Sequence, residues 1–219
     1  MTVTAPLNRA DISQGVDVIE EIARMIGFDR LPSKMPTIKT VNIPVDKRPR
    51  EIKEQMRRIL MARGVDEIIT HSMINAKALV KSNLAEISAV RIFNPLNQDQ
   101  ELMRPAILPS FLQVAMTNIN RGQKDLRFFE MGKSYYKSTE KQVLGLLLTG
   151  RRSYDWRSSK KETVDFFDLK GILEQIFQAI GIDVTYEAVS MKAFDPSCAS
   201  AVMFENKLLG VLGKINREV

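Results

Sequence analysis

Apolar residues recur every three or four positions in four segments of the chain, a spacing typical of helices with one face turned to a core. The pattern predicts helices over Val16–Ile26, Arg50–Arg63, Leu108–Asn120 and Phe166–Ile180. Glycines at positions 27, 64 and 181 directly follow three of these segments. Glycine commonly ends a helix because it adopts left-handed backbone angles easily, so these residues set the predicted ends.

Alternating or β-branched runs bounded by turn residues predict strands elsewhere. The predicted strands are Val3–Pro6, Glu67–Ile74, Val90–Phe93, Leu126–Tyr136, Val143–Thr149, Val184–Val189, Ala199–Phe204 and Leu208–Ile215. The two longest neighbours, Leu126–Tyr136 and Val143–Thr149, are expected to pair antiparallel. Strands and helices mix without strict β-α-β alternation, which favours the α+β class, with an antiparallel sheet flanked by helices.

A proline-rich segment divides the predicted elements into two groups. Leu31–Pro49 holds four prolines and no apolar periodicity, as a linker does. We expect residues 1–36 to be the C-terminal remnant of a small upstream module plus linker, and residues 37–219 to form one large domain, truncated at its C-terminus. The chain starts at a bare strand and stops just after another, so we expect a piece of a longer protein.

Composition and charge narrow the class of protein. The 219 residues are 44% apolar, enough for a substantial core, and the net charge of +6 favours an anionic partner such as RNA. A single cysteine, Cys198, fits a reducing compartment. No apolar run is long enough to span a bilayer, and the N-terminus lacks the layout of a signal peptide. We predict a cytoplasmic protein that makes no membrane contact.

The residues give little support to a catalytic site. The one histidine, His71, would have to serve any nucleophile alone, so we interpret it as a partly buried structural side chain. Cys198 is interpreted as a small core residue. The chain has neither a Cys/His set with zinc spacing nor a Walker-type phosphate loop. We therefore predict no catalytic residue, and whether the chain takes part in an enzyme stays open at this point.

Four carboxylates gather around the first predicted helix, at Asp11, Asp17, Glu20 and Glu21. Asp17 lies three and four residues before Glu20 and Glu21, so their charges crowd one side of the helix. One interpretation is a solvated helix start, supported by the helix dipole and by Arg24 four residues after Glu20. The other is a magnesium site, because hard carboxylate oxygens suit Mg²⁺. The residues alone leave both open.

A second candidate site mixes cations and aromatic rings between a predicted strand and a predicted helix. It comprises Arg151, Arg152, Tyr154, Trp156 and Arg157. Such a composition suits phosphate contact together with stacking on an unpaired base. The alternative is a solvated loop whose single tryptophan folds back on the core as an anchor.

Five segments, in order, resemble the family of phenylalanyl-tRNA synthetase beta subunits, and together they cover nearly the whole chain. They are the acidic run Pro6–Met35, the helix–Gly–strand entry Arg63–Ser72, Asn94–Pro109 with its Asn-Pro-Leu start, the strand Arg127–Lys133 with Phe-Glu-Met-Gly, and Trp156–Gly171 with Asp-Phe-Phe-Asp-Leu-Lys-Gly. The chain departs from the family at Asp195-Pro196 and at Asn216-Arg217, where the family tends to His-Pro.

The resemblance implies a fold and a set of partners. It implies the catalytic-like core of a class II aminoacyl-tRNA synthetase, with ATP bound only at the active site of a separate alpha subunit. It also implies an α₂β₂ heterotetramer that acts on tRNA, and Mg²⁺ shared with the alpha subunit at Asp11, Asp17, Glu20 and Glu21. Because helices of this core build the alpha–beta interface in the family, we expect exposed apolar faces on Arg50–Arg63 and Leu108–Asn120.

The catalytic motif of active class II members is altered in this chain. They carry an Arg-x-Glu strand, whereas the nearest candidate is Arg127-x-x-Glu130, one residue longer, which puts the two side chains on opposite faces of a strand. We therefore expect a non-catalytic beta-subunit core that scaffolds the alpha subunit. The alternatives are a stand-alone RNA-binding module of the same fold and an active aminoacyl ligase.

Overall fold

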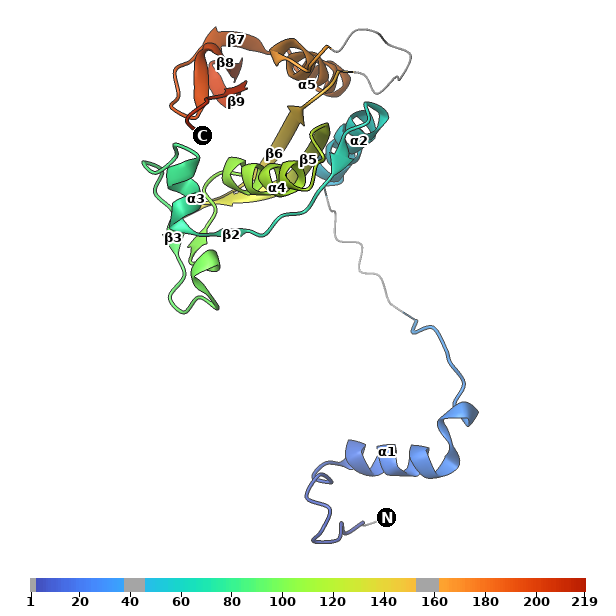
Figure 1. Ribbon diagram of the computed structural model, residues 1–219. Helices are drawn as coiled ribbons and strands as arrows, with labels where there is room; N and C mark the ends of the chain where they lie inside the picture. Colours follow the sequence, from blue (N-terminus) through green and yellow to red (C-terminus); the bar gives the residue numbers. More distant parts are fainter. Residues whose placement is uncertain (1–2, 38–45, 153–161) are drawn as a thin grey trace. The chain divides into compact units, whose positions relative to one another are not determined.

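The computed structural model describes residues 3–37, 46–152 and 162–219 (Figure 1). Contacts within the chain define two compact units, Met1–Val45 and Asp46–Val219. The first unit is small and helical, and the second contains all the strands of the described residues. The boundary that we predicted between residues 36 and 37 stays a prediction.

The first unit is built on helix α1 (Gly15–Ile26), followed by the short helix η1 (Phe28–Arg30). Asp17 stabilises the start of α1 because its Oδ2 accepts from the backbone N–H of Ser13 and Gln14. Gly27 ends the helix with a φ of +95°, which residues with a Cβ rarely adopt. The predicted helix is confirmed. The predicted strand Val3–Pro6 is wrong: the chain there is irregular and leads into a turn in which Arg9 N–H donates to the Pro6 carbonyl.

The second unit contains four α-helices among its described residues. They are α2 (Arg48–Ala62), α3 (Ala76–Lys81), α4 (Leu108–Asn120) and α5 (Phe166–Ile180), with a short η2 (Gln98–Gln100) before α4. Three of the four confirm the predicted helices. Helix α2 begins two residues earlier than predicted, and Pro49 lies in its first turn, where a missing N–H costs nothing.

The strands form three small sheets, each of three strands, within the described residues. The strands are β1 (Asp66–Glu67), β2 (Met73–Ile74), β3 (Val90–Arg91), β4 (Leu102–Met103), β5 (Leu126–Tyr135), β6 (Glu140–Thr149), β7 (Thr185–Ala188), β8 (Phe194–Phe204) and β9 (Lys207–Ile215). Their orders are β1-β5-β6, β2-β4-β3 and β7-β8-β9. The described pairs are antiparallel except β1 with β5, which is parallel, so the predicted antiparallel pairing holds for the other strands and not at this edge.

The predicted antiparallel pair is confirmed as the longest ladder of the molecule. Strands β5 and β6 pair from Leu126 opposite Thr149 to Tyr135 opposite Glu140. The predicted strand Glu67–Ile74, in contrast, is split into β1 and β2. The segment between them leaves the ladder because Thr70 hydrogen-bonds to a side chain, that of Glu130, by both its backbone N–H and its hydroxyl.

Helices cover both faces of the β5–β6 pair. Phe128 and Phe129 are neighbours on β5 and so point to opposite faces. Phe129 packs with Leu60 of α2 and Ile176 of α5, whereas Phe128 packs against Phe111 of α4, with ring centroids 5.3 Å apart. Figure 1 shows α4 beside this strand pair. The expectation that α2 and α4 expose their apolar faces is therefore wrong for their main stripes, because those stripes form the core.

Candidate functional site

A buried polar network joins three separate parts of the second unit. Arg104, directly after β4, donates from Nη2 to Oε1 of Glu130 on β5 at 2.7 Å. Its Nη1 lies 2.6 Å from Oγ1 of Thr70, and its Nε donates to the carbonyl of Lys133 at 3.0 Å. Arg104 and Glu130 are only 1% and 4% exposed. A buried charge pair of this kind persists only where further hydrogen bonds satisfy the remaining polar atoms.

Both carboxylate oxygens of Glu130 are occupied within this network. Oε1 accepts from Arg104, and Oε2 accepts from the hydroxyl of Thr70 at 2.6 Å and from its N–H at 3.2 Å. Gly132 lets the pair lie against β5, because a Cβ there would come within 2.3 Å of Arg104 Nη2 and 2.8 Å of Glu130 Oε1. The carboxylate is therefore enclosed, and each of its oxygens accepts at least one hydrogen bond from the chain itself.

Arg127, the other half of the altered motif, has different partners. Its Nη2 donates to the backbone carbonyls of Arg151, at 3.2 Å, and of Arg152. Glu130 bonds to Arg104 and Thr70 instead. The two side chains thus serve different contacts, as their spacing on a strand predicts.

Acidic side chains surround the two described arginines of the basic segment. Asp125 accepts from the backbone N–H of Arg151 at 2.7 Å and from its Nε at 2.8 Å. Arg152 forms ion pairs with three carboxylates, those of Glu162, Asp165 and Asp168, at 2.7–3.1 Å. The predicted nucleic-acid residues Tyr154, Trp156 and Arg157 lie outside the described residues. The segment stays a predicted nucleic-acid site, with the charge of Arg152 offset locally.

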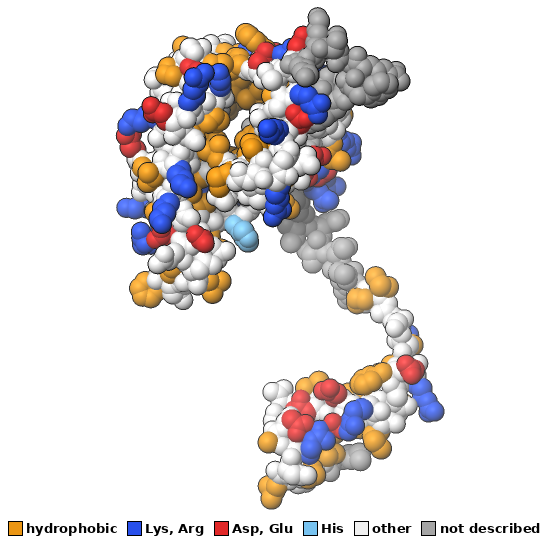
Figure 2. All heavy atoms as spheres, viewed as in Figure 1, with side chains coloured by type: hydrophobic (Ala, Val, Ile, Leu, Met, Phe, Trp, Pro, Cys, Tyr) orange, Lys and Arg blue, Asp and Glu red, His pale blue; other side chains and the backbone are white. Residues whose placement is uncertain are grey.

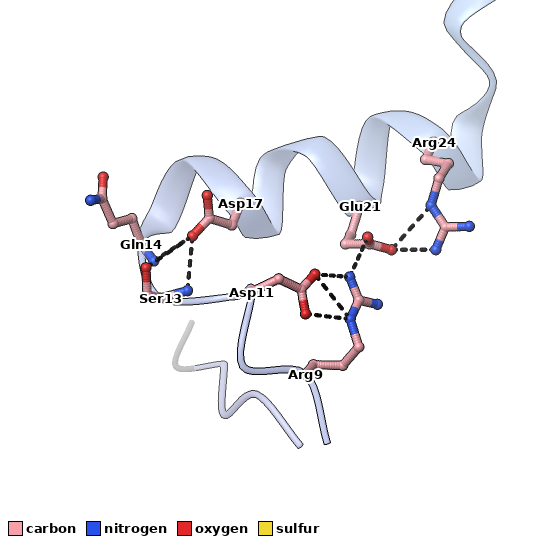
Figure 3. Close-up of polar contacts among 7 residues, drawn as sticks. All are labelled: Arg9, Asp11, Ser13, Gln14, Asp17, Glu21 and Arg24. Atoms are coloured by element: carbon pink, nitrogen blue, oxygen red, sulfur yellow. Dashed lines mark hydrogen bonds and ion pairs between the residues drawn. The ribbon is translucent and has the colours of Figure 1, made fainter. Parts of the chain in front are cut away.

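In the first unit, two arginines contact two of the four predicted metal ligands (Figure 3), and Figure 2 shows acidic and basic side chains side by side on this unit. Arg9 Nη2 lies 2.7 Å from Asp11 Oδ2 and 2.7 Å from Glu21 Oε1, so that one nitrogen bridges both carboxylates. Arg24 donates to the other oxygen of Glu21, with Nε at 3.2 Å. Asp17 is used by the helix start, and Glu20 is exposed one residue before Glu21.

These contacts shift the pKa values of the acidic groups. The hydrogen bond from Arg9, followed by that from Arg24, lowers the pKa of Glu21 to about 2. Arg9 likewise lowers the pKa of Asp11, and the backbone N–H of Gln14 is the largest cause of the lowered pKa of Asp17. Hydrogen bonds to Asp11 and Glu21 raise the pKa of the Arg9 guanidinium. All of these groups are therefore held in their charged forms at neutral pH.

Comparison with known protein families covers almost the entire chain. Residues 31–219 match the model of the phenylalanyl tRNA synthetase beta chain CLM domain, and residues 1–28 match that of the tRNA synthetase B5 domain. The chain belongs to the phenylalanyl-tRNA synthetase beta chain family. The resemblance predicted from the five segments is confirmed.

Relatives of this family match along the full chain but are much longer. The phenylalanine–tRNA ligase beta subunit of Syntrophus aciditrophicus (strain SB) is 32% identical over 229 residues, and that of Staphylococcus aureus is 27% identical over 223 residues. Each match covers 99% of this chain and 28% of the relative. The chain thus spans little more than a quarter of the length of the beta subunits it matches.

Solved aminoacyl-tRNA synthetases share the fold at low identity. A pyrrolysyl-tRNA synthetase from Desulfitobacterium hafniense gives a TM-score of 0.53 at 19% identity, covering 74% of this chain and 54% of that one. A histidine–tRNA ligase subunit from Alicyclobacillus acidocaldarius gives 0.52 at 17% identity, covering 72% and 46%. The α+β fold of the beta-chain family member is therefore synthetase-like.

The magnesium expected at the acidic residues does not fit their present arrangement. Among residues 3–37, 46–152 and 162–219, no group of three or more acidic, histidine or cysteine side chains is placed to hold a metal ion. The donors are hard oxygens of the right kind. Their oxygens, however, already accept from Arg9, Arg24 and the backbone. The magnesium site stays a prediction.

Three other observations bear on the expectations from sequence. His71 is exposed rather than partly buried, because the segment that carries it leaves the ladder between β1 and β2 (Figure 2). Cys198 is half-buried on β8. Its backbone carbonyl lies so close to Gly213 of β9 that a Cβ at position 213 would come within 2.9 Å of it. None of the helices in the described ranges has both the length and the apolar character that crossing a bilayer requires.

The Arg104–Thr70–Glu130 network was missed by sequence reasoning. A signal for part of it exists, because Glu130 stands among Phe128, Phe129 and Met131 in a predicted strand. A carboxylate in such surroundings needs a cation or several donors. The identity of that cation, 26 residues earlier in the chain, becomes visible only in the fold.

Proposed function

We propose that this chain is the non-catalytic core of a phenylalanine–tRNA ligase beta subunit. It scaffolds a catalytic alpha subunit and thereby supports aminoacylation of tRNA(Phe) in the cytoplasm. The family match supports this role, since the matched relatives are named beta subunits of that ligase. The holoenzyme we propose is an α₂β₂ heterotetramer, with ATP bound only at the alpha-subunit active site.

The proposed architecture is a class II synthetase catalytic-like core. The long β5–β6 pair, with α2 and α5 on one face and α4 on the other, supplies an antiparallel centre flanked by helices. The likeness to two solved synthetases supports the same assignment at the level of the fold. Fold alone does not make an enzyme, because catalysis depends on the groups that the site presents.

The occupied carboxylate of Glu130 carries the proposal that the core is non-catalytic. A strand carboxylate that binds substrate must be accessible to it, whereas Glu130 is 4% exposed and both of its oxygens already accept hydrogen bonds within the chain. Freeing Glu130 would break a buried ion pair, which costs about 3–5 kcal/mol. A substrate would have to supply that energy before gaining any contact of its own.

Exposed apolar side chains support a role in assembly. Phe93 and Leu96, in the loop between β3 and η2, are 102% and 92% exposed, and Ile69 is 92% exposed. Phe93 and Leu96 are three residues apart in one loop, and fully exposed large apolar side chains of this kind are candidates for contact with another protein. Contact with the alpha subunit would cover such residues, and magnesium shared with that subunit would require Arg9 to leave its carboxylates.

The stand-alone RNA-binding module has less support. Arg152, a main candidate for phosphate contact, forms ion pairs with three carboxylates. A phosphate would have to compete with those carboxylates for the same guanidinium. No described contact favours this second function over the first.

The experiment that tests the proposal is phenylalanine-dependent ATP–pyrophosphate exchange. It is measured on the purified chain, on the alpha subunit of the same organism, and on their mixture. We expect no exchange by the chain alone, and exchange by the mixture that exceeds exchange by the alpha subunit alone. Exchange catalysed by this chain alone, and abolished by Glu130→Gln, would overturn the proposal and restore the active ligase.

A further inference from the structure

The guanidinium of Arg9 occupies the space between two of the predicted metal ligands (Figure 3). It reaches Asp11 by Nε at 3.0 Å from Oδ1 and by Nη2 at 2.7 Å from Oδ2. The same Nη2 lies 2.7 Å from Oε1 of Glu21, twelve residues from Arg9 in the chain. This geometry is a fork on one carboxylate with a bridge to a second, which a planar guanidinium provides and an ammonium does not.

The charges of the Asp11–Glu21 pair already balance. Asp11 and Glu21 supply two negative charges, and Arg9 and Arg24 supply two positive ones. Every arginine contact is made to a carboxylate oxygen that a metal would need as a ligand. Mg²⁺ binds such oxygens at about 2.0–2.1 Å and keeps several waters around it. A guanidinium nitrogen bonded to the same oxygens leaves no room for that shell.

We propose that Arg9 is the resident cation of the Asp11–Glu21 pair, and that Arg9 and a divalent cation exclude each other there. The inference runs against the metal site that the family implies, in which these carboxylates are metal ligands. It concerns the first unit alone and does not rest on the proposed function. Arg9 then links the turn after Pro6 to helix α1, because its backbone N–H donates to the Pro6 carbonyl and its side chain donates to Glu21.

Manganese binding to the full 219-residue chain tests this inference. Mn²⁺ is a spectroscopic substitute for Mg²⁺, and the free ion is followed by electron paramagnetic resonance. Arg9→Gln removes the bridging cation, so we expect it to bind Mn²⁺ about tenfold more tightly than the unmodified chain, the factor that corresponds to one charge-assisted hydrogen bond. Arg24→Gln is the matched control, because Arg24 bonds to Glu21 but not to Asp11. It should raise the affinity for Mn²⁺ by less than about threefold, which is half of the tenfold effect on a logarithmic scale.

Several outcomes would overturn the inference. One is equal affinity of the unmodified chain and Arg9→Gln, whether both bind tightly or neither binds. Another is a gain in Arg24→Gln as large as that in Arg9→Gln, because general charge and not the bridge would then control binding. Should Arg9→Gln unfold α1, the Arg9 Nε–H resonance of the unmodified chain decides instead. It must lose its hydrogen-bonded shift as Mg²⁺ is added to saturation, and an unchanged resonance in a metal-bound chain refutes exclusion.

Discussion

Replacing Arg104 with methionine should lower the stability of the second unit by more than the removal of any surface charge does. Arg104 is 1% exposed, and its loss leaves Oε1 of Glu130 without its donor at a site that is 4% exposed. Removal of one partner from a buried ion pair costs about 3–5 kcal/mol. For a unit of 150–250 residues each kcal/mol lowers Tm by about 2–4 °C, so we expect a fall of about 6–20 °C.

Urea unfolding followed by far-UV circular dichroism measures the free energy directly. The free energy of unfolding should fall by the stated amount with an unchanged dependence on urea concentration, because the surface exposed on unfolding is the same. Lys192→Met is the matched control. Its ion pair with Glu86 joins side chains that are 73% and 80% exposed, and removing it should leave the midpoint unchanged.

The effect of Glu130→Gln on stability should change sign when Arg104 is replaced, which gives a second test. Glu130→Gln alone should destabilise the chain, because Arg104 then lacks its counter-charge. In the background of Arg104→Met the same substitution should stabilise the chain by about 2 kcal/mol, since it removes an unpaired buried charge while Thr70 keeps an acceptor. A double variant that is no more stable than Arg104→Met would show that the pair is not the source of the energy.

Three further changes test other parts of the structure. Gly132→Ala should cost about 1–3 kcal/mol in urea unfolding, because its Cβ would lie 2.3 Å from the Nη2 atom of the buried arginine, and an unchanged midpoint would contradict that close approach. The pKa of Glu21, about 2 rather than the ordinary 4.5, means that its ion pairs stabilise the first unit above about pH 4.5 and are lost as pH falls toward 2. A nuclear magnetic resonance titration should show this pKa rising in Arg9→Gln, and an unchanged value would remove Arg9 as its cause. Leu60→Ala should cost about 2–5 kcal/mol because Leu60 is fully buried, whereas Met61→Ala, at a side chain 59% exposed, should cost less than about 0.5 kcal/mol, and equal costs would contradict the assigned core.

The elements that sequence predicted well are those with a long local pattern. The apolar stripe of α5 and its closing Gly181 are visible in any window of a dozen residues. The pair β5–β6 is visible for a similar reason, as two long β-rich runs. Helix α3 has only six residues and is too short to show a helical period.

The elements that sequence did not predict depend on contacts between distant residues. The break between β1 and β2 occurs because Thr70 bonds to Glu130, sixty residues later. The same holds for the polar clusters. Helical spacing predicted Arg24 beside Glu20, four residues earlier, whereas in the structure it pairs with Glu21, three residues earlier. The bridge from Arg9 depends on how the turn after Pro6 folds back on α1. Spacing in the chain reports neighbours along a helix, but not a partner brought in by a turn.

The most direct test of the central claim is light scattering on a size-exclusion column, with this chain alone and then mixed with the alpha subunit of the same organism. The proposed scaffold role predicts that the two elute together, with a mass equal to a whole-number combination of the chains. It also predicts that Phe93→Ser with Leu96→Ser weakens this complex, because both side chains are almost fully exposed on the chain alone. Separate elution of the two proteins, with this chain folded by circular dichroism, would contradict the claim that this core holds the alpha subunit.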